Sequence, residues 1–405
     1  MKKMLKMMAV FVLSMVLLLS LQSVSAASYN APMPLTVYDA EFYATQAKSI
    51  EAYNRILNGL NSPANAASLD GASNYSDYYG GAYIDSETGK LIVLVTDVMS
   101  SQKESIHALA GENEDIEFRQ CETSFSKIEE AIAVITDHMI DLYDCGIDIV
   151  SVSDDIMNGQ VDVYVKDLNA EKESAIRAIA NYDFLMFFNS EGGELQTAYG
   201  AGSVINSVKD DSIPYSRDES STVCFGATRN GKKGLVVAGH AGFTYGCKFK
   251  IGDISGSVTK SAVQYSATTA DAAFVEFPNG INISNSVYFS NLSGGEMAIL
   301  PLNTQIMMRG GMSGFTTGKI TAVNATHSFV LPNGIKIYCS KNMEGDYPSQ
   351  AGDSGSPIVY VKDNQIGRVT YKVVGIHSQA FGNGKKGFSP YSNIVNELGV
   401  SWYHG

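Results

Sequence analysis

Hydrophobic and polar positions alternate in short runs along most of the chain, and longer helical stripes occur only in its first half. Apolar positions three or four residues apart predict an amphipathic helix over 125–142, and a weaker stripe predicts a helix over 39–60. Strict alternation, or a short apolar run bounded by turn residues, predicts β-strands instead. The pattern divides the chain near residue 192 into a mixed α and β half and a β-rich half.

One order of elements occurs twice in the first half. Each copy contains a β-hairpin, then a helix and then a strand, with a period near 70 residues. The second hairpin turns at Asn158-Gly159, a pair that favours a tight turn between antiparallel strands. The predicted elements are 81–85, 91–95, 103–110 and 116–118 in the first copy, and 149–152, 161–165, 172–180 and 184–188 in the second. We expect an α+β region made of two hairpin-helix-strand repeats.

The second half is expected to be all-β. Gly, Thr, Ser and Val dominate it, and Gly or Asn turns separate short alternating runs, which is typical of a barrel or a sandwich. Strands are predicted at 234–238, 273–277, 318–323 and 373–376, and one helix at 392–398. The stretch after Glu194 is long enough for two small β-barrels.

The first 26 residues have the pattern of a secretory signal peptide. Three lysines precede an apolar run over 7–21, and Val24-Ser25-Ala26 offers the small residues of a cleavage site. The apolar run is shorter than the ~20 residues that a membrane-spanning helix needs. We therefore expect a secreted, extracellular protein with no membrane association after signal cleavage, and an uncleaved anchor is the alternative.

Charge differs sharply between the two halves. Residues 27–194 contain 9 Lys and Arg against 29 Asp and Glu, a net charge of −20, whereas residues 195–405 have a net charge of +4. The acidity of the first half either keeps it soluble or lets it dock on the mildly basic second half. Neither half has the clustered Lys and Arg typical of nucleic-acid binding, so no nucleic-acid partner is expected.

Secretion would permit disulfide bonds between some of the five cysteines. Cys224 and Cys247 bracket His240, so a disulfide between them would close the loop that holds this histidine. The alternative is two buried free thiols, because cysteine pairing cannot be determined from sequence alone. The pairing of Cys121, Cys145 and Cys339 stays open.

Three motifs in the second half indicate nucleophilic catalysis. Gly352-Asp353-Ser354-Gly355 places a serine between glycines, which allow a tight turn with backbone N–H groups directed at a developing oxyanion. His240 follows Ala238-Gly239, and Asp271 precedes a predicted strand. The order His, Asp, Ser matches one of the three known chain orders of the serine–histidine–aspartate triad. Ser356 stands where a nucleophile elbow has glycine, so an esterase with that motif is disfavoured.

These motifs resemble those of the chymotrypsin-like serine endopeptidases, specifically their secreted bacterial branch with its α-lytic-type members. The resemblance covers about residues 200–398. It implies a protease domain at 195–405, made of two packed six-stranded antiparallel β-barrels with a C-terminal helix. The acidic segment 27–194 is similar to the pro-regions of this branch, which act as intramolecular chaperone and inhibitor until they are cut off. The chain would then be a preproprotein with its signal peptide at 1–26.

The same resemblance assigns roles to individual residues. His240, Asp271 and Ser354 would form the catalytic triad, and the N–H groups of Gly352 and Ser354 would form the oxyanion hole. Ser378 matches the serine that hydrogen-bonds the catalytic carboxylate and whose backbone pairs with the substrate. Substrates would be proteins or peptides, and no cofactor or metal is expected, since the sequence has no H-E-x-x-H motif. A catalytically inactive binding protein on the same fold is the alternative.

Residues near the serine bear on which side chain the enzyme would accept before the cut. Pro348 stands where trypsin-like members have an aspartate, which argues against Lys or Arg. His377 and Ser349 resemble the histidine and hydroxyl that receive a carboxylate in glutamyl endopeptidases, and a buried carboxylate needs such donors. A core histidine with a preference for small or apolar side chains is the alternative. A Glu preference would make Glu194 a site of self-cleavage.

Overall fold

The computed structural model describes residues 40–60, 77–111, 116–190, 193–195, 204–210, 212–213, 220–251, 254–278, 285, 292–365 and 368–403. The expected signal peptide lies outside these residues. All described elements belong to one unit of the chain, which begins at residue 38. None of the helices in the described ranges combines the length and the apolar character that crossing a lipid bilayer requires.

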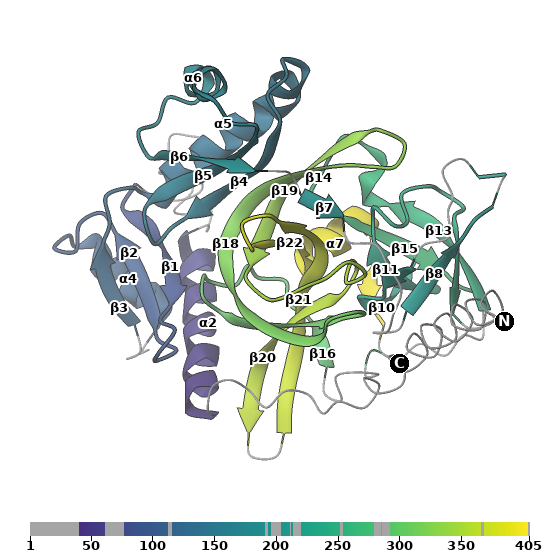
Figure 1. Ribbon diagram of the computed structural model, residues 1–405. Helices are drawn as coiled ribbons and strands as arrows, with labels where there is room; N and C mark the ends of the chain where they lie inside the picture. The colour runs from purple at the N-terminus through teal and green to yellow at the C-terminus, as the bar shows by residue number, and fades with distance from the viewer. Residues whose placement is uncertain are drawn as a thin grey trace, which may run out of the picture. The chain divides into compact units, whose positions relative to one another are not determined.

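The first half contains two copies of one arrangement (Figure 1). Each copy is an antiparallel hairpin, a helix and a third strand that pairs parallel with the second strand of the hairpin. The first copy consists of β1 (Tyr79–Ile84), β2 (Leu91–Val95), α4 (Gln102–Ala110) and β3 (Ile116–Gln120). The second consists of β4 (Ile149–Asp155), β5 (Gln160–Lys166), α6 (Ala170–Ile179) and β6 (Leu185–Ser190). The longer helix α2 (Ala40–Leu60) precedes the first copy, and the longer helix α5 (Phe125–Asp144) connects the first copy to the second.

The second half begins with an antiparallel sheet of eight strands in the order β23-β10-β11-β15-β13-β12-β8-β9. These strands are β8 (Val204–Val208), β9 (Ser220–Thr222), β10 (Phe225–Arg229), β11 (Lys232–Ala238), β12 (Lys248–Ile251), β13 (Ile254–Ser261), β15 (Ala272–Glu276) and β23 (Ser401–Trp402). The sheet has more than the six strands that we expected, because the short β9 and the C-terminal β23 extend its two edges.

Six antiparallel strands of the second sheet close into a ring, at the centre of Figure 1. Around the ring, β17 pairs with β18, then β19, β22, β21 and β20 follow, and β20 pairs again with β17. The ring strands are β17 (Gln305–Gly310), β18 (Gly314–Val330), β19 (Lys336–Gly345), β20 (Pro357–Gln365), β21 (Arg368–Phe381) and β22 (Lys386–Pro390). The remaining described elements are β7 (Gly193–Leu195), η1 (Ala262–Gln264), β14 (Ala267–Thr268), β16 (Leu292–Gly295) and α7 (Tyr391–Leu398).

Backbone pairing joins the first half to the ring at two edges. β4 pairs antiparallel with β18, so that Val152 lies opposite Thr326. The short β7 pairs antiparallel with β21, so that Glu194 lies opposite Ala380. Each pairing satisfies backbone groups of a ring strand that would otherwise need another partner or water.

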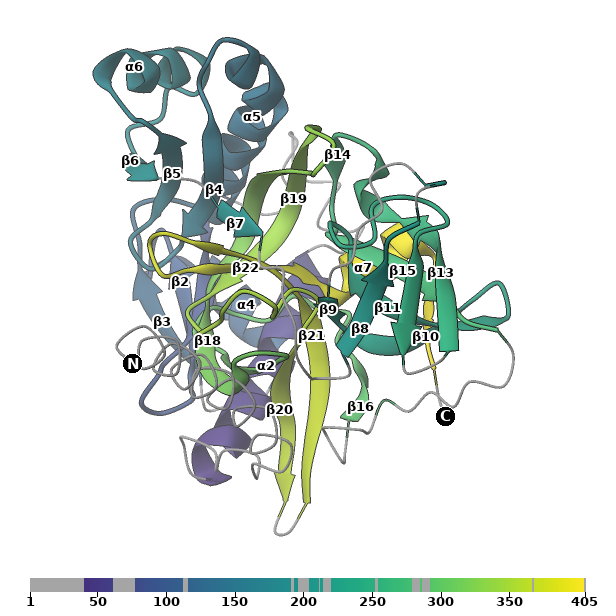
Figure 2. The ribbon, with the colours of Figure 1, turned by 45° about the vertical axis from the view of Figure 1, so that its right-hand side comes forward.

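A shared hydrophobic core also joins the two parts. α2 packs against β20, beside which it lies in Figure 2. One cluster of buried side chains includes Ile56 of α2 and Leu91 of β2 together with Ile306 and Ile358 of the ring. Burial of apolar surface stabilises such contacts by about 25 cal/mol per Å². The first half and the ring are therefore packed as one folded body.

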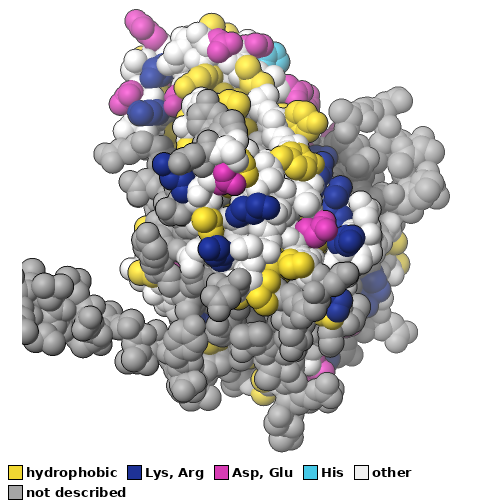
Figure 3. Space-filling model, turned by 90° about the vertical axis from the view of Figure 1, so that its right-hand side faces the viewer, with side chains coloured by type: hydrophobic (Ala, Val, Ile, Leu, Met, Phe, Trp, Pro, Cys, Tyr) yellow, Lys and Arg dark blue, Asp and Glu magenta, His cyan; other side chains and the backbone are white. Residues whose placement is uncertain are grey.

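Surface charge follows the contrast in the sequence. In Figure 3 the Asp and Glu side chains gather toward the top of the visible face, and most Lys and Arg side chains lie below them. A buried group of charges also lies where β4 and β5 meet the ring. Glu344 Oε2 is 3.2 Å from Lys385 Nζ, which is 3.5 Å from Asp162 Oδ2. Burial would raise the pKa of Glu344, but Lys385 and His327 lower it to about 2.

Asp154 of β4 is a second buried carboxyl group at this junction. Its Oδ1 accepts hydrogen bonds from the N–H groups of Val323 and Asn324, at 2.9 and 2.7 Å, whereas Oδ2 has no partner among the described residues. Burial raises the pKa of Asp154 to about 7, and the nearby Glu344 adds to this, although the two N–H groups oppose it. The folded protein therefore retains a proton there that the unfolded chain releases above pH ~4.

Asp154→Asn is expected to flatten the pH dependence of stability. Because the pKa is raised in the folded state, the free energy of unfolding falls as pH rises from about 4 to about 7, by roughly 4 kcal/mol at most. Asn keeps the acceptor for both N–H groups and cannot ionise, so this loss should disappear. Urea unfolding between pH 4.5 and 8, in a Ser354→Ala background that prevents self-cleavage, measures it. The half-exposed neighbour Asp155→Asn is the control, and equal slopes for all three proteins would contradict the expectation.

Candidate active site

A tight turn between β19 and β20 contains Ser354. Gly352 and Gly355 on either side have φ angles of +103° and +89°, in the left-handed region that favours glycine. A Cβ atom on Gly355 would lie 2.1 Å from the carbonyl oxygen of Thr222. The turn therefore requires the glycines that made this motif recognisable in the sequence.

The structure brings His240, Asp271 and Ser354 together. His240 lies just after β11 and Asp271 just before β15, and these neighbouring strands pair so that Ala238 is opposite Ala272. His240 Nδ1 is 2.6 Å from Asp271 Oδ2, and His240 Nε2 is 3.0 Å from Ser354 Oγ. The three residues are 0%, 0% and 1% exposed, respectively. They form one continuous hydrogen-bonded series that is closed to solvent in the full chain.

The carboxylate of Asp271 is held by several donors. Its Oδ1 accepts the His240 backbone N–H at 2.8 Å, and the Ser378 hydroxyl donates to Oδ2. A Cβ on Gly239 would be only 2.8 Å from Oδ1, so glycine permits the close approach. Burial would raise the pKa of Asp271, but the His240 side chain and the hydrogen bonds from His240 and Ser378 outweigh burial and lower it. The group is thus an anion that orients the imidazole.

Gly352 and Ser354 present the donors expected for an oxyanion hole. Their backbone N–H groups have no acceptor among the described residues. Their carbonyl groups are fixed by β9, because Thr222 N–H donates to the Ser354 oxygen at 2.9 Å and Thr222 Oγ1 donates to the Gly352 oxygen at 3.2 Å. Thr222 was not identified from the sequence, because nothing in Ser220-Ser221-Thr222 distinguishes this threonine from others.

The two residues expected to receive an acidic side chain, His377 and Ser349, differ in their hydrogen bonds: the His377 ring has a side-chain partner and the Ser349 hydroxyl has none among the described residues. The His377 imidazole is fully buried on β21, and its Nδ1 is 2.9 Å from the Tyr347 hydroxyl. Burial, reinforced by Lys386 and His240, lowers the pKa of His377 to about 3, so the imidazole is neutral near pH 7. Ser349 Oγ is buried and has no hydrogen-bond partner among the described residues.

The predicted Cys224–Cys247 disulfide is wrong. No two cysteines in the described ranges form a disulfide. The buried Cys224 thiol donates to the Gly375 carbonyl oxygen at 3.6 Å, whereas Cys247 packs in the core of the eight-stranded sheet. Bracketing His240 in the sequence does not determine where two side chains point, and these two occupy different environments. Burial raises the pKa of the Cys224 thiol well above its usual value.

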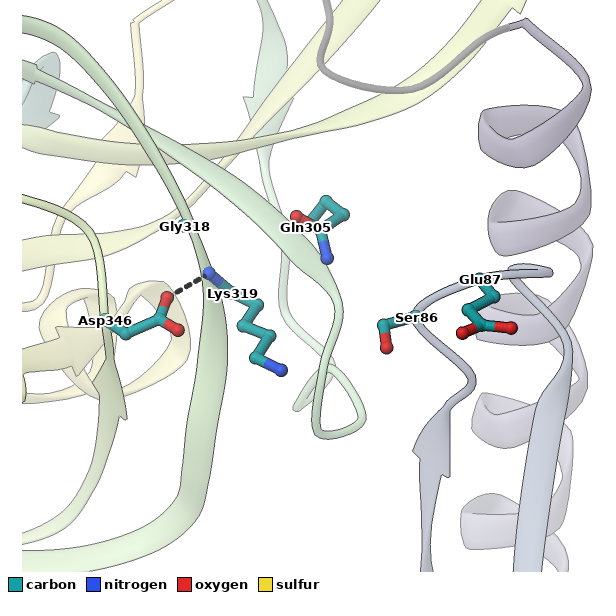
Figure 4. Close-up of a pocket in the computed structure, with 6 residues that line it drawn as sticks. All are labelled: Ser86, Glu87, Gln305, Gly318, Lys319 and Asp346. Atoms are coloured by element: carbon teal, nitrogen blue, oxygen red, sulfur yellow. Dashed lines mark hydrogen bonds between the residues drawn. The ribbon is translucent and has the colours of Figure 1, made fainter.

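A separate pocket lies between the β1–β2 turn and the ring (Figure 4). Its lining residues are Ser86, Glu87, Gln305, Gly318, Lys319 and Asp346. None of them is fully buried, and none belongs to the site described above. Within the described ranges no three His, Cys, Asp or Glu side chains lie together as metal ligands would.

Comparisons with known proteins gave one family match and several similar solved structures. Residues 38–121 match a family described as the Pro-like N-terminal domain. No curated protein matches the chain. Among solved structures, the chain is similar to a Nocardiopsis protease at 22% identity and a TM-score of 0.35, over 45% of this chain and 92% of that one.

Two further solved structures are similar to about half of the chain. Thermobifida fusca protease A shares 18% identity at a TM-score of 0.36, over 46% of this chain and 92% of its own. A glutamic acid specific serine protease, described as using a histidine triad in substrate binding, shares 18% identity at a TM-score of 0.35. That match covers 51% of this chain and 98% of the other.

Proposed function

We propose that the protein is a secreted serine endopeptidase of the chymotrypsin type, made as a precursor. The observation that carries the proposal is the hydrogen-bonded series from Asp271 through His240 to Ser354, beside two N–H groups that lack an acceptor among the described residues. A nucleophile within reach of a base, a base oriented by a third group, and donors for a developing oxyanion are the parts that acyl transfer needs. A noncatalytic binding protein would have no use for all of them.

The proposed mechanism divides acyl transfer among these groups. Ser354 Oγ attacks the scissile carbonyl carbon while His240 Nε2 takes its proton, and the N–H groups of Gly352 and Ser354 stabilise the oxyanion. As the intermediate collapses, His240 gives the proton to the leaving amine and an acyl-enzyme ester remains. Water then attacks this ester with His240 as base, and Ser354 regains its proton. Asp271 stays ionised and stabilises the imidazolium in both halves of the reaction.

Residues 27–194 would be the pro-region and 1–26 the signal peptide. Support comes from the core that α2 shares with the ring and from the pairing of β4 with β18, which would let the segment assist folding of the protease domain. The pairing of β7 with β21, the strand of Ser378, supports inhibition as well. An extended segment there would occupy the edge that a substrate backbone needs, until the chain is cut near Glu194.

The substrate preference we propose is Glu or Asp before the cut. Support comes from His377 and from the Ser349 hydroxyl, which has no partner in the described part of the chain and could donate to a carboxylate. The low pKa of His377 means that binding a carboxylate must bring a proton onto the imidazole, since a buried anion beside a neutral ring is poorly compensated. Preference for a small or apolar side chain is the competing assignment, with His377 as a core residue.

A panel of peptides that differ only in the residue before the scissile bond tests the processed protein. It tests whether the protein is a peptidase and whether it prefers an acidic residue at that position. We expect the Glu peptide to be cleaved about tenfold faster than its neutral isostere Gln at pH 5, where the proton that His377 must gain costs least, because charge-assisted hydrogen bonds contribute about 1.5–3 kcal/mol. The advantage of Glu should shrink as pH rises, since His377 must gain a proton. Equal cleavage after Leu and Glu would remove the acidic pocket, and no cleavage of any peptide would favour the inactive binding protein.

A further inference from the structure

Asp353 stands between the two proposed oxyanion donors and is fully buried. Four groups donate to its carboxylate. Oδ1 accepts the N–H groups of Met312 and Ser313, at 2.8 and 3.1 Å. Oδ2 accepts the Ser313 hydroxyl at 2.6 Å and the Gln350 N–H at 2.8 Å. No Lys or Arg side chain forms an ion pair with this carboxylate in the described part of the chain.

Three of the four donors belong to one surface turn. Residues 311–313 connect β17 to β18, and Gly310 lies opposite Gly314 where the hairpin closes. The turn approaches the carboxylate closely, because a Cβ on Gly310 would lie 2.4 Å from Asp353 Oδ1. Gly314 has a φ of +70°, which allows the chain to turn there. The hydroxyl of Ser313 is the only side-chain donor in this set.

We infer that Ser313 is a positioning residue for the oxyanion hole of the proposed reaction. A buried carboxylate needs its hydrogen bonds, so the turn and Asp353 hold each other in one arrangement. Asp353 shares a peptide bond with Ser354, so its fixed side chain restricts the plane that carries the Ser354 N–H. The Gly352 N–H lies in the preceding peptide, in the short segment from Gln350 to Asp353 that is closed by the Gln350 N–H bond to Asp353 Oδ2 and by the Asp353 N–H bond to the Gln350 oxygen at 3.1 Å. Thr222 fixes the carbonyl groups of Gly352 and Ser354 from the other side. Ser313 thus acts through Asp353 and does not touch the substrate.

Ser313→Ala is expected to lower kcat about 10- to 100-fold and to leave KM within about twofold. The reason is that small displacements of oxyanion donors cost orders of magnitude in rate and little in ground-state binding. Affinity for a peptidyl trifluoromethyl ketone, whose adduct with Ser354 has an oxyanion, should fall by the same factor as kcat. Ser313→Thr retains the hydroxyl and should restore most of the rate. If Ser313→Ala does not fold, Ser313→Cys replaces it, and its weaker donor should give an intermediate loss.

Ser293→Ala is the matched control for the loss of one hydroxyl. Ser293 Oγ donates to the Tyr371 carbonyl oxygen at 3.1 Å, in β16 beside the ring and apart from Asp353. Ser293→Ala should lower the free energy of unfolding about as much as Ser313→Ala does, and it should leave kcat unchanged. An active parent whose Ser313→Ala or Ser313→Cys variant keeps the full kcat would overturn the inference and leave the proposed function standing. A parent that cleaves no peptide and binds no ketone would overturn the proposed function itself, and this inference with it.

Discussion

Ser354→Ala is expected to lower kcat by about 10⁶-fold while the protein folds normally. The side chain is almost completely buried, and alanine removes only the oxygen that His240 Nε2 approaches at 3.0 Å. Without it no acyl-enzyme can form, so a fluorophosphonate probe should label Ser354 in the processed parent and nothing in the variant. Self-cleavage should also stop, so the variant should accumulate with the first half still attached, whereas the parent should be cut between about residues 190 and 205.

Ser356→Ala is the matched control for this change. Ser356 lies two positions further along the same turn, is buried, and has a hydroxyl without a hydrogen-bond partner among the described residues. It should therefore keep peptide cleavage, labelling and self-cleavage. Hydrolysis that persists in Ser354→Ala, with the circular dichroism of the parent, would mean that another residue is the nucleophile.

Element type could be predicted wherever the local pattern is strictly periodic. The apolar run 91–95 is strand β2, and the stripe from Phe125 is helix α5. The prediction was less accurate for long bent strands. Residues 318–323 were expected as one short strand, but β18 extends over Gly314–Val330, and its pairing with β19 shifts register at several points. Such irregularities interrupt the alternation on which the prediction depends.

Strand pairing could not be predicted, because it depends on which edges the rest of the fold leaves open. Nothing in the sequence near residue 152 indicates that β4 pairs with β18. The disulfide prediction was wrong for another reason, because bracketing His240 in the sequence does not determine the directions of the Cys224 and Cys247 side chains. The nucleophile, base and acid were easier to identify, because their order and flanking glycines are distinctive. Ser313 was missed, because a serine in a Met-Ser-Gly turn looks like any other turn residue.

Asp271→Asn is expected to lower kcat by about 10⁴-fold, with KM little changed. The carboxylate accepts three hydrogen bonds, from the His240 N–H, from His240 Nδ1–H and from the Ser378 hydroxyl. Asparagine has one oxygen for these donors. When that oxygen faces the His240 backbone N–H, which cannot move its proton, the NH₂ group faces His240 Nδ1 and the Ser378 hydroxyl. The imidazole can avoid the clash by moving its proton from Nδ1 to Nε2. Nε2 then lacks the lone pair that accepts the Ser354 proton, so the base is lost although its position is kept.

Ser378→Ala separates this loss of the base from the loss of one hydrogen bond. Ser378→Ala keeps the carboxylate of Asp271 and removes one of its donors, so kcat should fall only roughly 10- to 100-fold. Fluorophosphonate labelling should slow in the same order as kcat in both variants, because the probe also needs an activated serine. An Asp271→Asn variant within tenfold of the parent would mean that the imidazole does not depend on Asp271 for its tautomer. Since burial alone would raise the pKa of Asp271, and these donors lower it, the carboxylate stays charged wherever His240 acts as base.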